Sequence, residues 1–135
     1  MVEKLVRTCV MCAFLLVVAA FSGCGTHLTS LTESQDGSTL SLKPGDGFTV
    51  KLPSNPTTGY SWQVLEIDSG ILEMVGEPVF QPDSNEQGLV GAGGTETLHF
   101  EAKRSGESSL SLGYARPWEA DEPPLKTFTI HLVVE

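Results

Sequence analysis

Residues 127–134 read Thr-Phe-Thr-Ile-His-Leu-Val-Val, with an apolar side chain at almost every second position. Successive side chains of an extended strand point to opposite faces, so this pattern indicates a strand with one buried face. Five more stretches alternate in the same way, at about 38–43, 47–52, 60–67, 95–103 and 107–115. The sequence contains no long amphipathic helix pattern. The chain is therefore expected to be all-β.

Turn signals separate these stretches. They are Pro44-Gly45-Asp46-Gly47, Asp83-Ser84-Asn85, Arg104-Ser105-Gly106 and Asp121-Glu122-Pro123-Pro124. The segment 71–81 is compatible with one or two short strands around Pro78, and a single helical turn near 69–72 stays open. About seven or eight short antiparallel strands within about 100 residues predict an immunoglobulin-like β-sandwich.

The N-terminal part has the pattern of an export signal. After a short basic start, residues 10–21 form an unbroken apolar run. A membrane span needs about 20 apolar residues, whereas the centre of a secretory signal takes about 7–15. The following Ser22-Gly23-Cys24 resembles the bacterial lipoprotein signal, in which cleavage precedes a cysteine that carries the lipid. Plain secretion stays open because Phe21 stands where leucine is commoner, and so does a chance cysteine.

Three segments are expected: a lipoprotein-type signal peptide at 1–23, a polar tether at 24–37, which is poor in large apolar residues, and one domain at 38–135, where the strand patterns lie. The protein would be exported and held by a lipid on Cys24, in the periplasm or at the cell surface. Cys9 and Cys12 lie in the signal segment, so the domain would contain no disulfide. Its stability must then come from a packed core.

Charge and residue spacing exclude several functions. Residues 24–135 hold six basic and sixteen acidic side chains, a net charge of −10, which argues against nucleic-acid binding. His27, His99 and His131 are scattered and lack metal-ligand spacing. The glycines at 91–94 lead into a strand, whereas a phosphate-binding loop opens a helix. We therefore expect no enzyme, no catalytic residue, no metal and no cofactor.

Three unusual connections carry the candidate binding residues. They read Asn55-Pro56-Thr57-Thr58-Gly59, Gly91-Ala92-Gly93-Gly94 and Arg116-Pro117-Trp118. In an immunoglobulin-like sandwich these connections are expected at one end. Proline lowers the entropy lost on docking, glycine allows close backbone approach, and arginine and tryptophan are favoured interface anchors. Packing of Trp118 on the end of the sandwich stays open, while Trp62 is expected in the core.

These three motifs, in this order, resemble the chagasin family of cysteine-protease inhibitors, and the resemblance covers residues 38–135. It implies a monomeric, reversible, tight-binding inhibitor of papain-like cysteine peptidases that presents the three loops as a wedge. The 55–59 loop would cover the catalytic Cys–His pair. The loops at 91–94 and 116–118 would grip the cleft on either side.

A second reading is a non-inhibitory exported immunoglobulin-like surface lipoprotein. Such a module would serve adhesion, envelope assembly or carbohydrate binding. A sugar-binding site needs an exposed aromatic platform with nearby carboxylates, and Trp118-Glu119 with Asp121-Glu122 is a sparse version of one.

Overall fold

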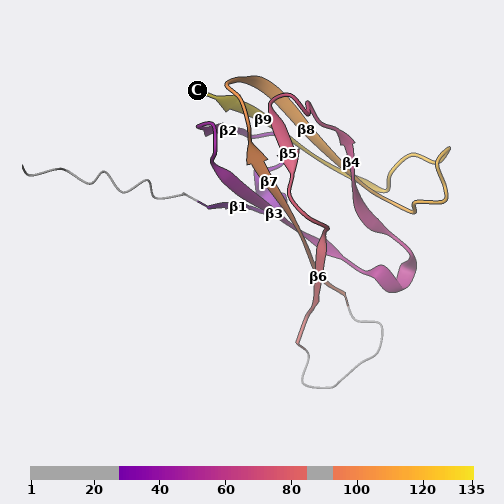
Figure 1. Ribbon diagram of the computed structural model, residues 1–135. Helices are drawn as coiled ribbons and strands as arrows, with labels where there is room; N and C mark the ends of the chain where they lie inside the picture. Colours follow the sequence, from indigo (N-terminus) through magenta and orange to yellow (C-terminus); the bar gives the residue numbers. More distant parts are fainter. Residues whose placement is uncertain (1–27, 85–92) are drawn as a thin grey trace, which may run out of the picture.

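A computed structural model describes residues 28–84 and 93–135 of the chain, which form two β-sheets packed face to face (Figure 1). The first sheet contains β1 (Thr29–Leu31), β3 (Gly47–Ser54), β5 (Leu72–Met74), β6 (Val79–Pro82) and β7 (Gly94–Ala102). The second contains β2 (Thr39–Leu42), β4 (Ser61–Glu66), β8 (Gly106–Ala115) and β9 (Lys126–Val134). Two single 3₁₀ turns, Glu33–Gln35 and Pro56–Thr58, complete the described part. The predicted β-sandwich is confirmed.

The alternating pattern of the sequence becomes the core. Along β7, β8 and β9 the apolar positions are buried between the sheets, while their neighbours point outward. The rings of Phe48 and Phe100 stack in the first sheet with centroids 5.3 Å apart. The ranges 28–84 and 93–135 contain no cysteine, so packing rather than a disulfide holds this part together.

Two strand pairings are parallel, although the sequence predicted antiparallel pairing throughout. β1 runs parallel to β3, and β2 runs parallel to β9. The β1 pairing also shifts the start of the domain, because residues 29–31 lie in the segment 24–37 that was expected to be a tether. Leu31 is only 5% exposed and belongs to the core. β1 covers the edge of β3 that β7 leaves unpaired, and Leu31 adds an apolar side chain to the core.

The ambiguous segment 71–81 holds two short strands. Both β5 and β6 pair with β7, β6 near the start of that strand and β5 near its end. Residues 69–71 form a turn rather than a helix. Within the two described ranges, no helix is long and apolar enough to cross a membrane.

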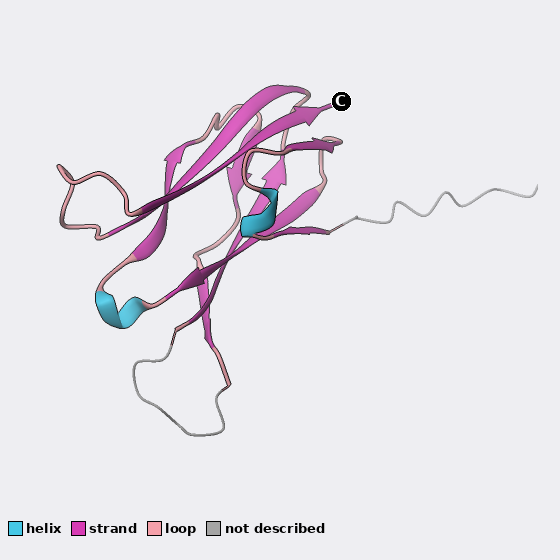
Figure 2. Cartoon of the chain, turned by 180° about the vertical axis from the view of Figure 1, so that it is seen from behind, coloured by secondary structure: helices cyan, strands magenta, loops and turns pink. Residues whose placement is uncertain are grey.

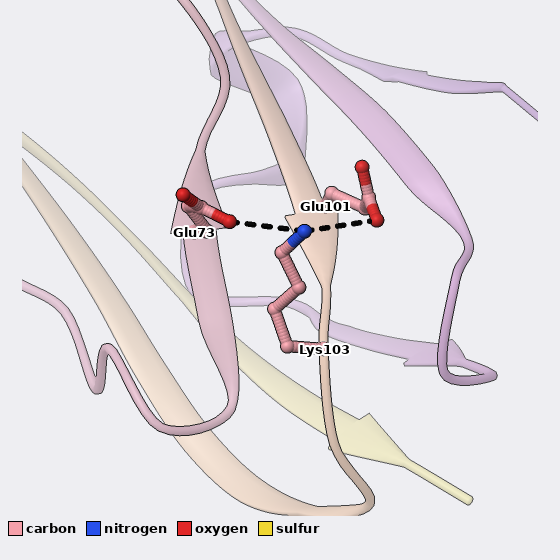
Figure 3. A network of polar contacts seen from close by, with 3 residues as sticks. All are labelled: Glu73, Glu101 and Lys103. Carbon is pink, nitrogen blue, oxygen red and sulfur yellow. Dashed lines mark hydrogen bonds and ion pairs between the residues drawn. The ribbon is translucent and has the colours of Figure 1, made fainter.

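A cluster of three charges joins β5 to β7 (Figure 3). Glu73 and Glu101 are paired directly across the two strands, where like charges repel. Lys103 lies between them, with Nζ 2.9 Å from Glu73 Oε2 and 3.1 Å from Glu101 Oε1. Hydrogen bonds to these two carboxylates raise the pKa of Lys103 above its ordinary value of 10.5.

The raised pKa predicts the pH dependence of a Lys103→Met variant. A lysine whose pKa is higher in the folded state stabilises the fold fully below its unfolded pKa, and this contribution is lost as the pH rises through the folded value. We therefore expect Lys103→Met to lower the urea midpoint slightly at pH 8, since exposed ion pairs contribute little. The difference from the parent protein should shrink as the pH rises beyond 10.5.

Lys51→Met is the matched control, because this exposed lysine on β3 has no ion pair within the described residues. The loss of the Lys103→Met difference at high pH should exceed any change for Lys51→Met, because only Lys103 has carboxylate partners to lose. A difference for Lys103→Met that persists at high pH would contradict the assigned role of the lysine.

Candidate functional site

Strand register brings the three candidate connections to one end of the sandwich. Ser54 at the end of β3 pairs with Gly94 at the start of β7, and Ser61 at the start of β4 pairs with Ala115 at the end of β8. The 3₁₀ turn 56–58 and the connection from β8 to β9 lie at the same end (Figure 2). We call residues 55–59, 93–94 and 116–118 the loop edge. Gly91 and Ala92 of the second motif lie outside the described residues.

The 55–59 loop is a single 3₁₀ turn shaped by its own side chains. Asn55 caps the turn by accepting from the Thr57 N–H at 3.3 Å and from the Thr57 hydroxyl. The Thr58 hydroxyl donates to the Asn55 carbonyl at 2.6 Å. Pro56 fits the first position of the turn, where no N–H is needed, and Gly59 ends it with φ of +82°. Both threonine hydroxyls donate inside the loop, so each can offer a partner only its acceptor oxygen.

Close backbone contacts explain why the two described positions of the second motif, 93 and 94, are glycines. β6 pairs with β7 so closely at Gly94 that a Cβ there would overlap the carbonyl oxygen of Gln81. A Cβ at Gly93 would lie 3.3 Å from the carbonyl oxygen of Ser54. These glycines let β6, β7 and the end of β3 converge beside the 55–59 loop.

The 116–118 segment contacts the 55–59 loop directly. Arg116 Nε donates to the Thr58 carbonyl at 3.2 Å, and its guanidinium lies 4.6 Å from the centre of the Tyr60 ring. The Trp118 ring lies against Gly59, where a Cβ would be 2.6 Å from Cη2 of the indole. Trp118 nevertheless remains 68% exposed, so it rests on the edge without being buried beneath it.

Aromatic rings form a platform under the loop edge. Tyr114 stacks with Tyr60 at 5.4 Å and contacts Trp62 at 5.2 Å between centroids. The Tyr114 hydroxyl accepts a hydrogen bond from the backbone N–H of Asn55 at 2.8 Å, so the platform also holds the start of the loop. Trp62 is 3% exposed, which confirms its predicted place in the core.

Trp62 also ties the two sheets together. Its indole N–H donates to the carbonyl of Pro53 on β3 at 3.0 Å. Its backbone N–H lies 3.2 and 3.3 Å from the two carboxylate oxygens of Glu96 on β7. Glu96 is 5% exposed, and a buried carboxylate requires such donors.

Sequence reasoning missed three supporting residues of the edge: Glu96, Tyr114 and Glu119. Glu96 had a visible signal, because it is in phase with Leu98 and Phe100 on the face predicted to be buried. Glu119 had none, since its pairing with Arg116 at 3.1 Å depends on the turn that follows Pro117. In the ranges 28–84 and 93–135, no cluster of His, Asp or Glu side chains could hold a metal ion.

Comparison with known proteins gives the class to which this fold and edge belong. Residues 41–132 match the family described as chagasin family peptidase inhibitor I42. The chain is 36% identical to chagasin of Trypanosoma cruzi over 106 residues, which covers 76% of this chain and 94% of chagasin. It is 29% identical over 104 residues to amoebiasin-2 of Entamoeba histolytica, covering 77% of this chain and 83% of that protein.

Solved structures agree. A crystal structure of a cysteine protease inhibitor from Entamoeba histolytica superimposes with a TM-score of 0.71 at 28% identity, covering 80% of this chain and 96% of that one. The solution structure of amebosin gives a TM-score of 0.65 at 31% identity, covering 80% and 98%. The chain therefore belongs to the chagasin family, which is a family of peptidase inhibitors and not of enzymes.

The contact between Gly59 and Trp118 can be tested with two glycine variants. Gly59→Ala forces an alanine into a left-handed conformation, which costs about 1–2 kcal/mol, and places its Cβ against the indole. We expect a lower free energy of unfolding and a displaced indole N–H resonance of Trp118 in NMR spectra. Gly76→Ala is the control, since Gly76 has a similar φ of +73° and no atom within 4 Å of an added Cβ. If both variants leave the Trp118 resonance in place, the contact does not order the indole.

Proposed function

We propose that this protein is a reversible, tight-binding inhibitor of papain-like cysteine peptidases that acts as a monomer and fills the active-site cleft with three loops. The loops are those at 55–59, 91–94 and 116–118. The proposal rests on the direct contact between the first and third loops. Arg116 donates a hydrogen bond to the Thr58 carbonyl, and the Trp118 ring packs against Gly59. Two family motifs are thereby joined at one edge by residues that lie 58 positions apart.

The shape of the 55–59 loop supports a role over the catalytic pair. The Asn55 cap, Pro56 and the hydrogen-bonded threonines leave this turn little freedom. A substrate must align its scissile carbonyl with the nucleophile, since productive chemistry requires reacting atoms at about 3–3.5 Å in the correct orientation. A turn held in a 3₁₀ conformation does not offer an extended peptide bond for attack. It would therefore occupy the cleft without being cleaved.

Trp118 is the expected anchor of the third loop. It is a large aromatic side chain that is 68% exposed, and one side of its ring lies against Gly59. Tryptophan is among the residues that most often dominate interface energies. A three-loop wedge would bury about 1,600 Å² in total, the usual size for protease–inhibitor complexes.

The first test is a titration of papain with the purified protein, following residual peptidase activity. We expect tight inhibition. Trp118→Ala should weaken binding by about 2 kcal/mol or more, mainly through faster dissociation. The triple variant Thr57→Ala, Thr58→Ala and Trp118→Ala should abolish tight inhibition while retaining the circular dichroism spectrum of the parent.

Val75→Ala is the control for Trp118→Ala, because Val75 is also an exposed apolar side chain (47%) but lies beyond β5, away from the loop edge. It should inhibit like the parent. Failure of the folded parent to inhibit both papain and a cathepsin L-like peptidase would refute the proposal. The reading as a non-inhibitory surface module would then take precedence.

We also propose that Cys24 carries a lipid, so that the inhibitor is exported and membrane-anchored. β1 supports this arrangement. Thr29 pairs with Phe48 near the start of β3, whereas the loop edge begins after Ser54 at the other end of that strand. Six residues of strand separate these positions by about 20 Å. An anchor at Cys24 would therefore leave the loop edge directed away from the membrane.

The anchor can be tested with Cys24→Ser expressed in a bacterial host. We expect the parent to enter the detergent phase and its mature mass to include a diacylglycerol. Cys24→Ser should lose both properties. Cys12→Ser lies in the expected signal peptide and should behave like the parent. Equal partitioning of Cys24→Ser and the parent would rule out this anchor.

A further inference from the structure

We infer that Glu119 is a positioning residue of the loop edge: it fixes the guanidinium of Arg116, and through Arg116 it sets the position of the 55–59 loop. The expected effect on peptidase binding rests on the proposed inhibitory function. The effect on the positions of Arg116 and the 55–59 loop can be tested in the free protein.

Arg116 is held from three sides. Its Nε donates to the Thr58 carbonyl at 3.2 Å, its Nη1 lies 3.1 Å from Glu119 Oε1, and the Tyr60 ring lies 4.6 Å from its Cζ. Each partner constrains a different part of the planar group, because the fork geometry of guanidinium fixes the directions of its donors. Together they define one orientation of the side chain.

Glu119 is itself placed by the backbone. Its N–H donates to the carbonyl of Arg116 at 3.0 Å, which closes the turn that contains Pro117. The two side chains are therefore neighbours by a local constraint. About a third of each side chain is exposed, so water screens the pair only in part.

This arrangement changes the expected role of Arg116. From the sequence, Arg116 was an interface anchor, a residue that reaches a partner directly. In the structure two of its nitrogens bond within the protein and its face lies on Tyr60. Its main contribution is therefore to hold the first and third loops together. A prearranged edge loses less conformational entropy when it binds.

Glu122 provides a matched comparison on the same loop. Glu119 and Glu122 both line a hollow of about 320 Å³ beside Tyr60 and Arg116. The Glu122 side chain has no hydrogen bond or ion pair with any part of the chain that the structure describes, although its backbone N–H bonds to the Glu119 carbonyl. Removing one charge from either residue changes the net charge equally. Only the Glu119 change removes a charge that is paired with Arg116.

The decisive experiment uses NMR spectroscopy of the protein without any peptidase. In Glu119→Gln we expect the Arg116 Nε–H signal to exchange faster with water, and the Gly59 amide to shift because it adjoins the Thr58 carbonyl. Glu122→Gln should leave both signals in place. If Glu119→Gln leaves them unchanged, or both variants change them alike, the positioning role is wrong.

A second measurement carries the inference to binding. Ion pairs that water partly screens are weak, so Glu119→Gln should raise the papain inhibition constant about two- to fivefold while Glu122→Gln leaves it unchanged. In an Arg116→Met background, Glu119→Gln should have no further effect, since the residue it orients is gone. An equal loss in both backgrounds would mean that Glu119 acts on the peptidase itself. If the parent does not inhibit papain, the proposed function fails, and the NMR result still decides the role of Glu119.

Discussion

The hydrogen bonds of Trp62 tie the two sheets together directly beneath the loop edge. β4 is one of the two edge strands of its sheet, and the backbone N–H of Trp62 on this strand donates to the carboxylate of Glu96 in the other sheet. The indole N–H reaches β3 at Pro53. Burying a carboxylate is unfavourable unless it accepts hydrogen bonds, so Glu96 is tolerated where a backbone donor would otherwise lack a partner. Since β3 ends and β4 begins at the 55–59 loop, these bonds set the width of its base.

The loop edge combines two levels of constraint. The conformation of the 55–59 loop is local, because the Asn55 cap, Pro56 and the left-handed Gly59 define it within five residues. Its position relative to the third loop is tertiary, because it depends on Arg116 and on the platform around Tyr114. A loop that has its shape but not its position would still present the correct turn at the wrong angle. Both levels therefore contribute to preorganisation, which lowers the entropic cost of association.

How far the sequence predicts this structure depends on how many residues carry each signal. Alternation over nine residues of β7 or β9 identifies the buried face, because every second side chain repeats the same information. β1 has only three residues, of which only Leu31 is buried, so the sequence shows no alternating pattern there that would predict a strand. Thr49 lies on the polar face of β3 yet is buried, since Ser30 of β1 pairs beside it. The strand that the sequence did not reveal thus accounts for the burial of a polar position on its neighbour.

The motif residues can be identified from the sequence more readily than the residues that support them. A motif can be recognised from residue types in order, and arginine next to proline and tryptophan reads as part of an interface. Whether a guanidinium faces outward or inward depends on which acceptors lie nearby. Thr58, 58 residues away in the sequence, becomes a neighbour of Arg116 only after folding. An internal brace and an external anchor therefore look identical in sequence. The two roles differ in which acceptors the guanidinium donors reach. In this protein Nε and Nη1 of Arg116 donate to acceptors of the same chain.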